Sequence, residues 1–183
     1  LTPDLITYTF EGRVIITLNI IEPTNYIVLH EKDLEIRSIF LNVNNKQVAP
    51  VETYIDKENE KLALRFKEKI IPGEVNLIIS YNGILNDQMT GFYRSIYVVD
   101  GKEKTLAVTQ FEDTSARMAF PCFDEPNVKA RFRITLIIPK NLDALSNTKV
   151  SKLTLSGTNL KIIQFEDTPI MSTYILAFCV GEF

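Results

Sequence analysis

The stretch "RVIITLNI", Arg13 to Ile20, places Val14, Ile16, Leu18 and Ile20 at every second position. Side chains of a β-strand point alternately to its two faces, so this period predicts a strand with one apolar face turned toward a core. An α-helix repeats every 3.6 residues and does not match the pattern. The stretch therefore predicts a half-buried strand, and the flanking sequence can be searched for its partners.

The same alternation recurs along most of the chain. It is clear in three further groups: Leu62, Leu64 and Phe66; Val75, Leu77 and Ile79; Phe132, Ile134, Leu136 and Ile138. A run that is apolar on both faces, "TYILAFCV" (173–180), predicts an inner strand.

Turn-forming sequences separate these strands every 8 to 15 residues, among them "NNKQ" (44–47), "DKENE" (56–60), "IPGE" (71–74) and "VDGKE" (99–103). This spacing is typical of an antiparallel β-sandwich or a set of bent sheets. Only "DTSARMAF" (113–120) suits a turn or two of helix, with Asp113 or Thr114 as the N-cap. The sequence predicts an all-β fold.

Size and composition indicate one globular domain, residues 1–183, that can bury a core without disulfides or metals. The net charge of −3 and the scattered basic residues argue against nucleic acid as a partner. No apolar run reaches the length of a membrane span. Leu1 is not a methionine, so we expect the true start to lie upstream. Cys122 and Cys179 sit among apolar residues, which favours buried free thiols over a disulfide.

A search for catalytic residues finds little. The only histidine is His30, whereas a zinc site needs several His or Cys ligands at close spacing. The seven glycines are spread singly, so no phosphate-binding loop is present, and no "GxSxG" nucleophile motif occurs. Taken alone, these residues indicate a non-catalytic domain.

One long segment, "TQFEDTSARMAFPCFDEPNVKARF" (109–132), breaks the regular alternation. In an extended chain Gln110 and Glu112 share one face, and Phe111 points to the other. A carboxylate beside an amide can clamp an ammonium group, because the carboxylate forms a charge-assisted bond that the amide helps to orient. The simpler interpretation is the polar outer face of a strand whose Phe enters the core, and the residues alone favour it.

Beyond its chemistry, "TQFEDTSARMAFPCFDEP" (109–126) resembles a signature element of the M1 family of zinc aminopeptidases. The resemblance continues in "VKARFRITLIIPK", in the opening residues "LTPDLITYTFEG", in "GFYRS" and in "MSTYILAFCVGEF". It therefore covers essentially the whole chain in the correct order. Among family members the chain most resembles the puromycin-sensitive and oxytocinase-like aminopeptidases.

The resemblance implies a saddle-shaped β domain that precedes a thermolysin-like zinc domain. The H-E-x-x-H and Gly-Ala-Met-Glu-Asn motifs of that catalytic domain do not occur here. The chain is thus expected to be the first domain of a longer cytoplasmic enzyme, truncated at both ends. Zinc would belong to the parent enzyme, and this domain alone should neither bind it nor hydrolyse peptides. It would instead expose an apolar patch where the missing catalytic domain docks.

The resemblance also assigns roles to two residues. Glu112 would help to anchor the free α-amine of a peptide substrate, and Gln110 would line the subsite for its first side chain. The rest of the segment is interpreted as scaffold, in which Arg117 pairs with Asp124 or Glu125 to hold the loop.

Two alternatives remain open. The chain could be a stand-alone β-sandwich interaction module without an enzymatic parent. It could also belong to leukotriene-hydrolase-like relatives with epoxide chemistry, but those carry a second amide where Glu112 stands, so the carboxylate argues for a peptidase.

Overall fold

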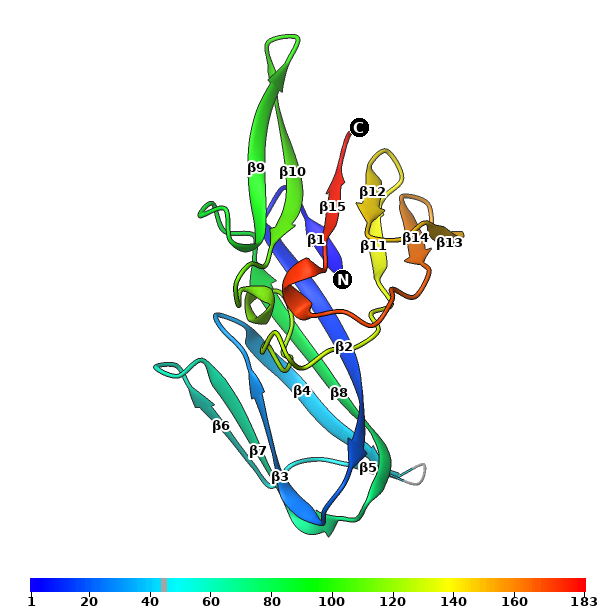
Figure 1. Cartoon of the computed structure of the whole chain (residues 1–183). Coiled ribbons are helices and arrows are strands. Elements are labelled where there is room, and N and C mark those ends of the chain that lie inside the picture. Colours follow the sequence, from blue (N-terminus) through cyan, green and yellow to red (C-terminus); the bar gives the residue numbers. More distant parts are fainter. Residues whose placement is uncertain (44–45) are drawn as a thin grey trace.

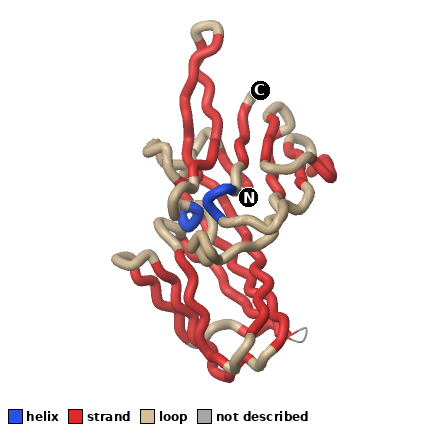
Figure 2. The backbone as a smooth tube through the Cα atoms, in the orientation of Figure 1, coloured by secondary structure: helices blue, strands red, loops and turns tan. Residues whose placement is uncertain are grey.

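The structure is a computed structural model that describes residues 1–43 and 46–183, and β-strands dominate it (Figures 1 and 2). The first eight strands are β1 (Thr2–Asp4), β2 (Thr9–Ile20), β3 (Thr24–His30), β4 (Glu35–Val43), β5 (Lys46–Val48), β6 (Glu52–Asp56), β7 (Lys61–Ile70) and β8 (Gly73–Ile84). The remaining strands are β9 (Gly91–Val99), β10 (Lys102–Gln110), β11 (Thr135–Pro139), β12 (Asp143–Ser146), β13 (Val150–Ser156), β14 (Leu160–Phe165) and β15 (Phe178–Gly181).

The strands form four sheets, and the predicted all-β, antiparallel fold is confirmed. In Figure 1 the sheet β3–β7–β6 faces the sheet β1–β2–β8–β4–β5 in the lower half of the molecule. The upper half holds the sheets β12–β15–β10–β9 and β11–β14–β13. Strands β9 and β10 continue beyond their neighbours as a projecting hairpin.

The core lies where the predicted alternation placed it. Leu62, Leu64 and Phe66 of β7 are almost fully buried, as are Leu77 and Ile79 of β8. On β2, the four apolar residues of the opening stretch are half-buried, whereas the residues between them are exposed. Period two thus identified the inward faces correctly, because a strand with one buried face must repeat at that period.

Two expected strands are shorter than predicted. β11 begins only at Thr135, because Phe132 bonds irregularly across to Thr168: its N–H donates to the Thr168 side chain, and its carbonyl accepts from the Thr168 N–H. In "TYILAFCV", Thr173–Ile175 forms a short 3₁₀ helix (η2), and only Phe178–Gly181 is a strand. That strand lies between β10 and β12, so the prediction of an inner strand is confirmed for this part.

The predicted helical turn is present but displaced. Ala116–Met118 forms a 3₁₀ helix (η1) whose N-cap is Ser115, not Asp113 or Thr114, and no side chain caps it. The first two residues of the predicted "NNKQ" turn lie outside the described residues.

Aromatic rings join the two halves of the molecule. Phe10 of β2 contacts Phe92 of β9 with a centroid distance of 5.2 Å, and Phe92 contacts Phe178 of β15 at 5.0 Å. Phe111 then packs edge-on against Phe178 at 6.0 Å and against Phe120 at 5.9 Å. These edge-to-face contacts carry the core from the large sheet into the segment after β10.

Glycines make room for two of the rings between β2 and β8. Gly12 lies opposite Tyr81 in the register, and Gly83 lies opposite Phe10. A Cβ atom at Gly12 would lie 2.3 Å from the Tyr81 ring, and one at Gly83 would lie 2.1 Å from the Phe10 ring. Each ring therefore covers the bare backbone of the facing strand, which a larger residue could not allow.

This packing predicts that Gly12→Ala destabilises the fold. Because the ring of Tyr81 is buried and cannot move into open space, we expect a loss of about 1–3 kcal/mol, typical of overpacking. Urea unfolding followed by circular dichroism measures it. Asn19→Ala, on the exposed face of the same strand, is the control and should change stability by less than about 0.5 kcal/mol. Equal stability of the two variants would contradict the packing argument.

Candidate functional site

Gln110, Phe111 and Glu112 lie at the end of β10. Gln110 is the last residue of the strand and pairs with Gly91 of β9. Gln110 and Glu112 are exposed, whereas Phe111 is only 1% exposed and lies among the aromatic rings. The structure therefore brings the amide and the carboxylate to the surface on either side of a buried ring. The arrangement offers a carboxylate acceptor and a nearby amide to a cationic group.

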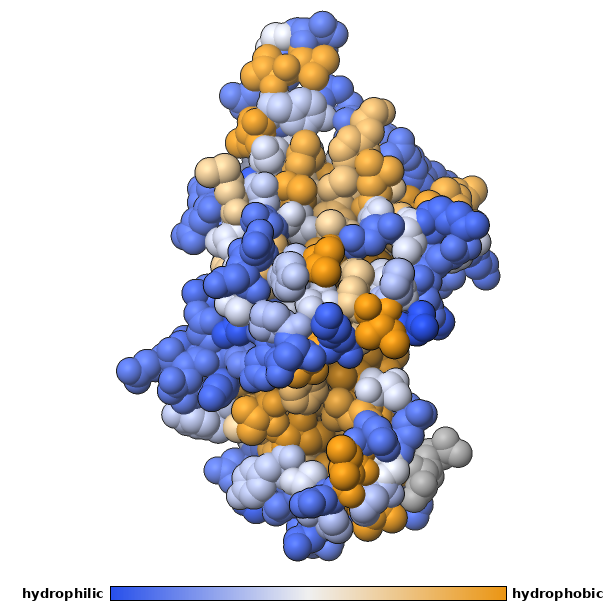
Figure 3. Space-filling model, in the orientation of Figure 1, coloured by the Kyte–Doolittle hydropathy of each residue, from blue (hydrophilic) through white to orange (hydrophobic). Residues whose placement is uncertain are grey.

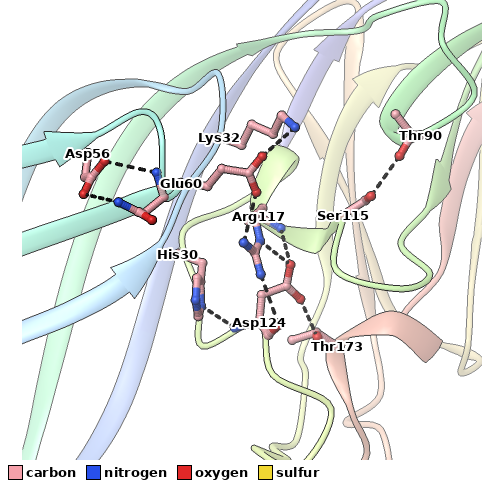
Figure 4. Close-up of polar contacts among 10 residues, drawn as sticks. His30, Lys32, Asp56, Glu60, Thr90, Ser115, Arg117, Asp124 and Thr173 are labelled. Atoms are coloured by element: carbon pink, nitrogen blue, oxygen red, sulfur yellow. Dashed lines mark hydrogen bonds and ion pairs between the residues drawn. The ribbon is translucent and has the colours of Figure 1, made fainter.

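The backbone around this pair is held on both sides. Next to Gln110, the Thr109 side chain accepts a hydrogen bond from the Phe178 N–H at 3.0 Å. After Glu112, the chain turns back at once, because the Ser115 N–H donates to the Phe111 carbonyl at 2.9 Å. The Ser115 hydroxyl also bonds to the Thr90 hydroxyl at 2.8 Å (Figure 4). The Glu112–Asp113 peptide bond within this turn is cis.

An apolar surface adjoins the pair. On the outer face of the sheet, Tyr93, Val108, Cys179 and Leu145 are cross-strand neighbours, and Gln110 shares this face because it follows Val108 by two residues. None of these side chains is fully buried, and Leu145 is 58% exposed. Figure 3 also shows apolar atoms at the surface of the hairpin formed by β9 and β10. We refer to Tyr93, Val108, Cys179 and Leu145 as the outer face.

Arg117 is the centre of a polar network beneath the loop (Figure 4). Its Nε donates to Asp124 Oδ2 at 3.0 Å, and its Nη1 donates to Glu60 Oε2 at 3.0 Å. Glu60 is also paired with Lys32 at 2.6 Å. The Arg117 side chain is 11% exposed and that of Asp124 is fully buried, so solvent screens this pair very little.

Asp124 is satisfied from several directions. The Arg117 N–H donates to Oδ2 at 3.1 Å, and the Thr173 hydroxyl donates to Oδ1 at 2.7 Å. Of the two acidic partners expected for Arg117, the structure therefore brings Asp124 to it, while Glu125 is exposed and its carbonyl closes a turn with Val128. A fully buried carboxylate with these donors holds the loop in one conformation.

The same loop is bonded to the end of β3. His30 and Cys122 exchange both backbone hydrogen bonds, at 2.8 and 3.1 Å, and the Asp124 N–H donates to His30 Nδ1 at 3.2 Å. Burial disfavours the imidazolium and Arg117 repels it, so the pKa of His30 lies below its ordinary value of 6.5. Burial also raises the pKa of the Cys122 thiol. His30 is thus a neutral structural acceptor near neutral pH.

The sequence contained little that could identify Lys32, Glu60, Thr173 and His30 as partners of this loop. They come from three segments that are far apart in the chain, and each is an ordinary residue in its own segment. Their only local signal is their position at or just beyond the end of a strand or in a turn. Tertiary folding brings them together.

Among residues 1–43 and 46–183, no group of three or more His, Cys, Asp or Glu side chains could hold a metal ion. Both cysteines are free: Cys122 is buried as expected, but Cys179 is only half-buried, on the outer face. In the part of the chain that the structure describes, no helix is long and apolar enough to cross a membrane.

Comparison with known proteins gives a consistent result. The Peptidase M1 N-terminal domain family matches residues 1–175. The chain is 44% identical over 187 residues to Aminopeptidase M1 of Arabidopsis thaliana and 40% identical over 185 residues to the puromycin-sensitive aminopeptidase of Caenorhabditis elegans, each match covering 100% of this chain. It is 38% identical over 187 residues to Aminopeptidase N of Canis lupus familiaris, over 96% of this chain. The chain spans about a fifth of the length of these relatives: 21%, 20% and 19%.

The network around Arg117 predicts that Arg117→Met is strongly destabilising. The variant keeps much of the side-chain volume but leaves the buried Asp124 carboxylate without its cation, so we expect a loss of about 3–5 kcal/mol in the free energy of unfolding.

The matched control is Arg37→Met, because Arg37 pairs with Glu35 at the surface, where the side chains are 58% and 62% exposed. It should cost less than about 1 kcal/mol. Chemical denaturation of both variants measures the difference, and similar losses would show that the Arg117 pair does not hold the loop.

His30 predicts a dependence of stability on pH. Above its ordinary pKa of 6.5 the imidazole is neutral in both states, but below it the unfolded chain binds the proton first, because the folded pKa is lowered. Stability should therefore fall as the pH drops from about 7 to about 5. His30→Asn retains an acceptor for the Asp124 N–H without titrating, so its thermal midpoint should fall less over this range. Parallel curves for the two proteins would refute a role of His30 in this fall.

Proposed function

Because the chain belongs to the Peptidase M1 N-terminal domain family, we propose that it serves as the substrate-anchoring first domain of a zinc aminopeptidase. In this role it binds the amino terminus of a peptide while the rest of the parent protein carries out hydrolysis. The alternative of a stand-alone interaction module is not favoured, since the family match covers nearly the whole chain.

The exposure of Glu112 beside the buried Phe111 carries the proposal. Burial of the ring directs the carboxylate to the surface, where it can accept a charge-assisted hydrogen bond from a substrate α-ammonium group. Gln110, two residues earlier, lies within the same short segment and would contact the first side chain of the substrate. A carboxylate that recognises a free amine selects for cleavage at the end of a peptide, because internal residues carry no such charge.

The contribution of this domain is position. Holding the amine at a fixed point orients the first peptide bond and lowers the entropic cost of reaching the transition state. The residues of this chain do not fit a zinc site: His30 is the single histidine, its Nδ1 is engaged by the Asp124 N–H, and the described residues contain no cluster of ligands. Zinc and the hydrolytic groups are therefore assigned to the remainder of the parent protein.

The outer face is the proposed contact with the catalytic domain. Its apolar side chains lead directly to Gln110 along β10, so a domain docked there would receive both polar side chains at its border. Partly exposed apolar side chains that are contiguous on one sheet favour a protein contact. The free thiols of Cys122 and Cys179 support a cytoplasmic location, where cysteines stay reduced.

The experiment that tests the proposal is Glu112→Gln in the full-length parent enzyme. The substitution preserves shape but removes the charge, so kcat/KM for a substrate with a free amino terminus should fall between about tenfold and about a hundredfold. Asp113→Asn is the matched control, since Asp113 is the adjacent exposed carboxylate, and it should change kcat/KM by less than about twofold.

A binding measurement separates the amine from other effects. In the unaltered enzyme, an amino acid should inhibit more strongly than the carboxylic acid that lacks its α-amine. Glu112→Gln should reduce that difference by at least about tenfold. An unchanged difference would remove Glu112 from amine recognition.

A further inference from the structure

One edge of β2 is left open for most of its length. β1 pairs with β2 only from Thr9 to Glu11, whereas β8 pairs with it from Thr9 to Ile20. From Gly12 onward, β2 therefore has a ladder partner on one side only in the described residues. An unpaired edge exposes backbone N–H and C=O groups that can bind another strand.

Leu1 shows the direction in which such a strand would run. Its N–H group donates to the Thr135 carbonyl and its carbonyl accepts from the Ile137 N–H, both at 2.9 Å. These are the bonds of a parallel pair, so β1 lies parallel to β11 and antiparallel to β2. Upstream of Leu1, a continuing chain would lie between β2 on one side and residues 131–135 on the other (Figure 1).

A groove occupies this place. It has a volume of about 560 Å³, with Leu1 at its end. One wall consists of Arg13, Val14, Ile15 and Thr17 of β2, and the other of residues 131–135. Its lining also includes the buried side chains of Tyr81, Phe120 and Leu176. A second groove lined by residues 14–17 and 128–132 adjoins it, so the open space follows the edge of β2.

We propose that this groove is a strand slot, filled by an extended segment that precedes Leu1 in the longer parent chain, continues β1, and pairs with the free edge of β2. The proposal rests on the proposed function only in requiring a longer parent. Continuing the register that pairs Thr2 with Glu11 and Pro3 with Phe10, the third residue before Leu1 falls opposite Ile15, and the fifth opposite Thr17.

The register also defines the chemistry of the occupant. Pro3 and its partner Phe10 both face the core, so every second residue of a continued strand does the same. The second and fourth residues upstream of Leu1 lie opposite Val14 and Ile16 and should be apolar, because they cover the buried lining of the groove. The first, third and fifth face outward, on the side of Arg13 and Thr17, and should be polar or acidic.

The position of Leu1 agrees with a continuing chain. Desolvation lowers the pKa of its amino group to about 6, so a charged terminus is disfavoured at this point. A peptide N–H can make the same bond to the Thr135 carbonyl without carrying a charge. A chain that passes through this point thus removes a desolvation cost.

The test compares the 183-residue chain with the same chain extended upstream by the eight residues that its coding sequence specifies. We expect the extension to slow amide hydrogen exchange at residues 13–17 and 131–135 by at least about tenfold and to raise the melting temperature. Exchange at Leu64 and Phe66, in the core of β7, serves as the internal check that both polypeptides are folded.

Two substitutions in the extension test the register. Aspartate at its second and fourth residues before Leu1 should abolish the added protection, whereas aspartate at the first and third should preserve it. Equal effects of the two pairs, or no added protection in the unaltered extension, would overturn the proposal. Protection that rises with protein concentration in the 183-residue chain would assign the groove to a second copy and would also overturn it.

Discussion

Burial of the Phe111 ring is the constraint on which the candidate site depends. The ring packs against Phe120 and Phe178, so the backbone at the end of β10 can take only an orientation that keeps it inside. Gln110 and Glu112, its neighbours in sequence, are then turned to the surface. The polar pair is thus positioned by an apolar contact that touches neither side chain, and the same row of rings joins the large sheet to the upper half of the molecule.

The Arg117 network solves the second problem of the segment, which is how to hold an irregular loop between two ordered regions. Backbone groups in a loop have no ladder partners, so side chains and neighbouring strand ends must supply them. Asp124 collects donors from Arg117, Thr173 and its own loop, while His30 and Cys122 connect the loop to β3. A buried ion pair contributes little net stability, but it strongly disfavours conformations that separate its partners. Such a loop can present a binding pair at a domain border without rearranging.

The open edge of β2 and the outer face point to the same conclusion about this domain. Both expose groups that soluble proteins usually cover, a free strand edge in one case and contiguous apolar side chains in the other. Each lies beside a feature that leads out of the chain: the slot ends at Leu1, and the outer face ends at Gln110. A domain that completes its surfaces with other parts of one polypeptide fits relatives about five times its length.

The sequence by itself determined the all-β class, the inward faces of β2, β7 and β8, and the exposure of Gln110 and Glu112 around a buried Phe111. Each follows from period two, a local property of any half-buried strand. Tertiary structure alone decided where β11 and β15 begin, since Phe132 and Thr173–Ile175 leave the ladder to meet loop partners. It also selected Asp124 over Glu125 as the partner of Arg117 and brought Glu60, Thr173 and His30 to the same loop. Contacts between residues far apart in the chain depend on how the sheets pack, and no local pattern of residues records that packing.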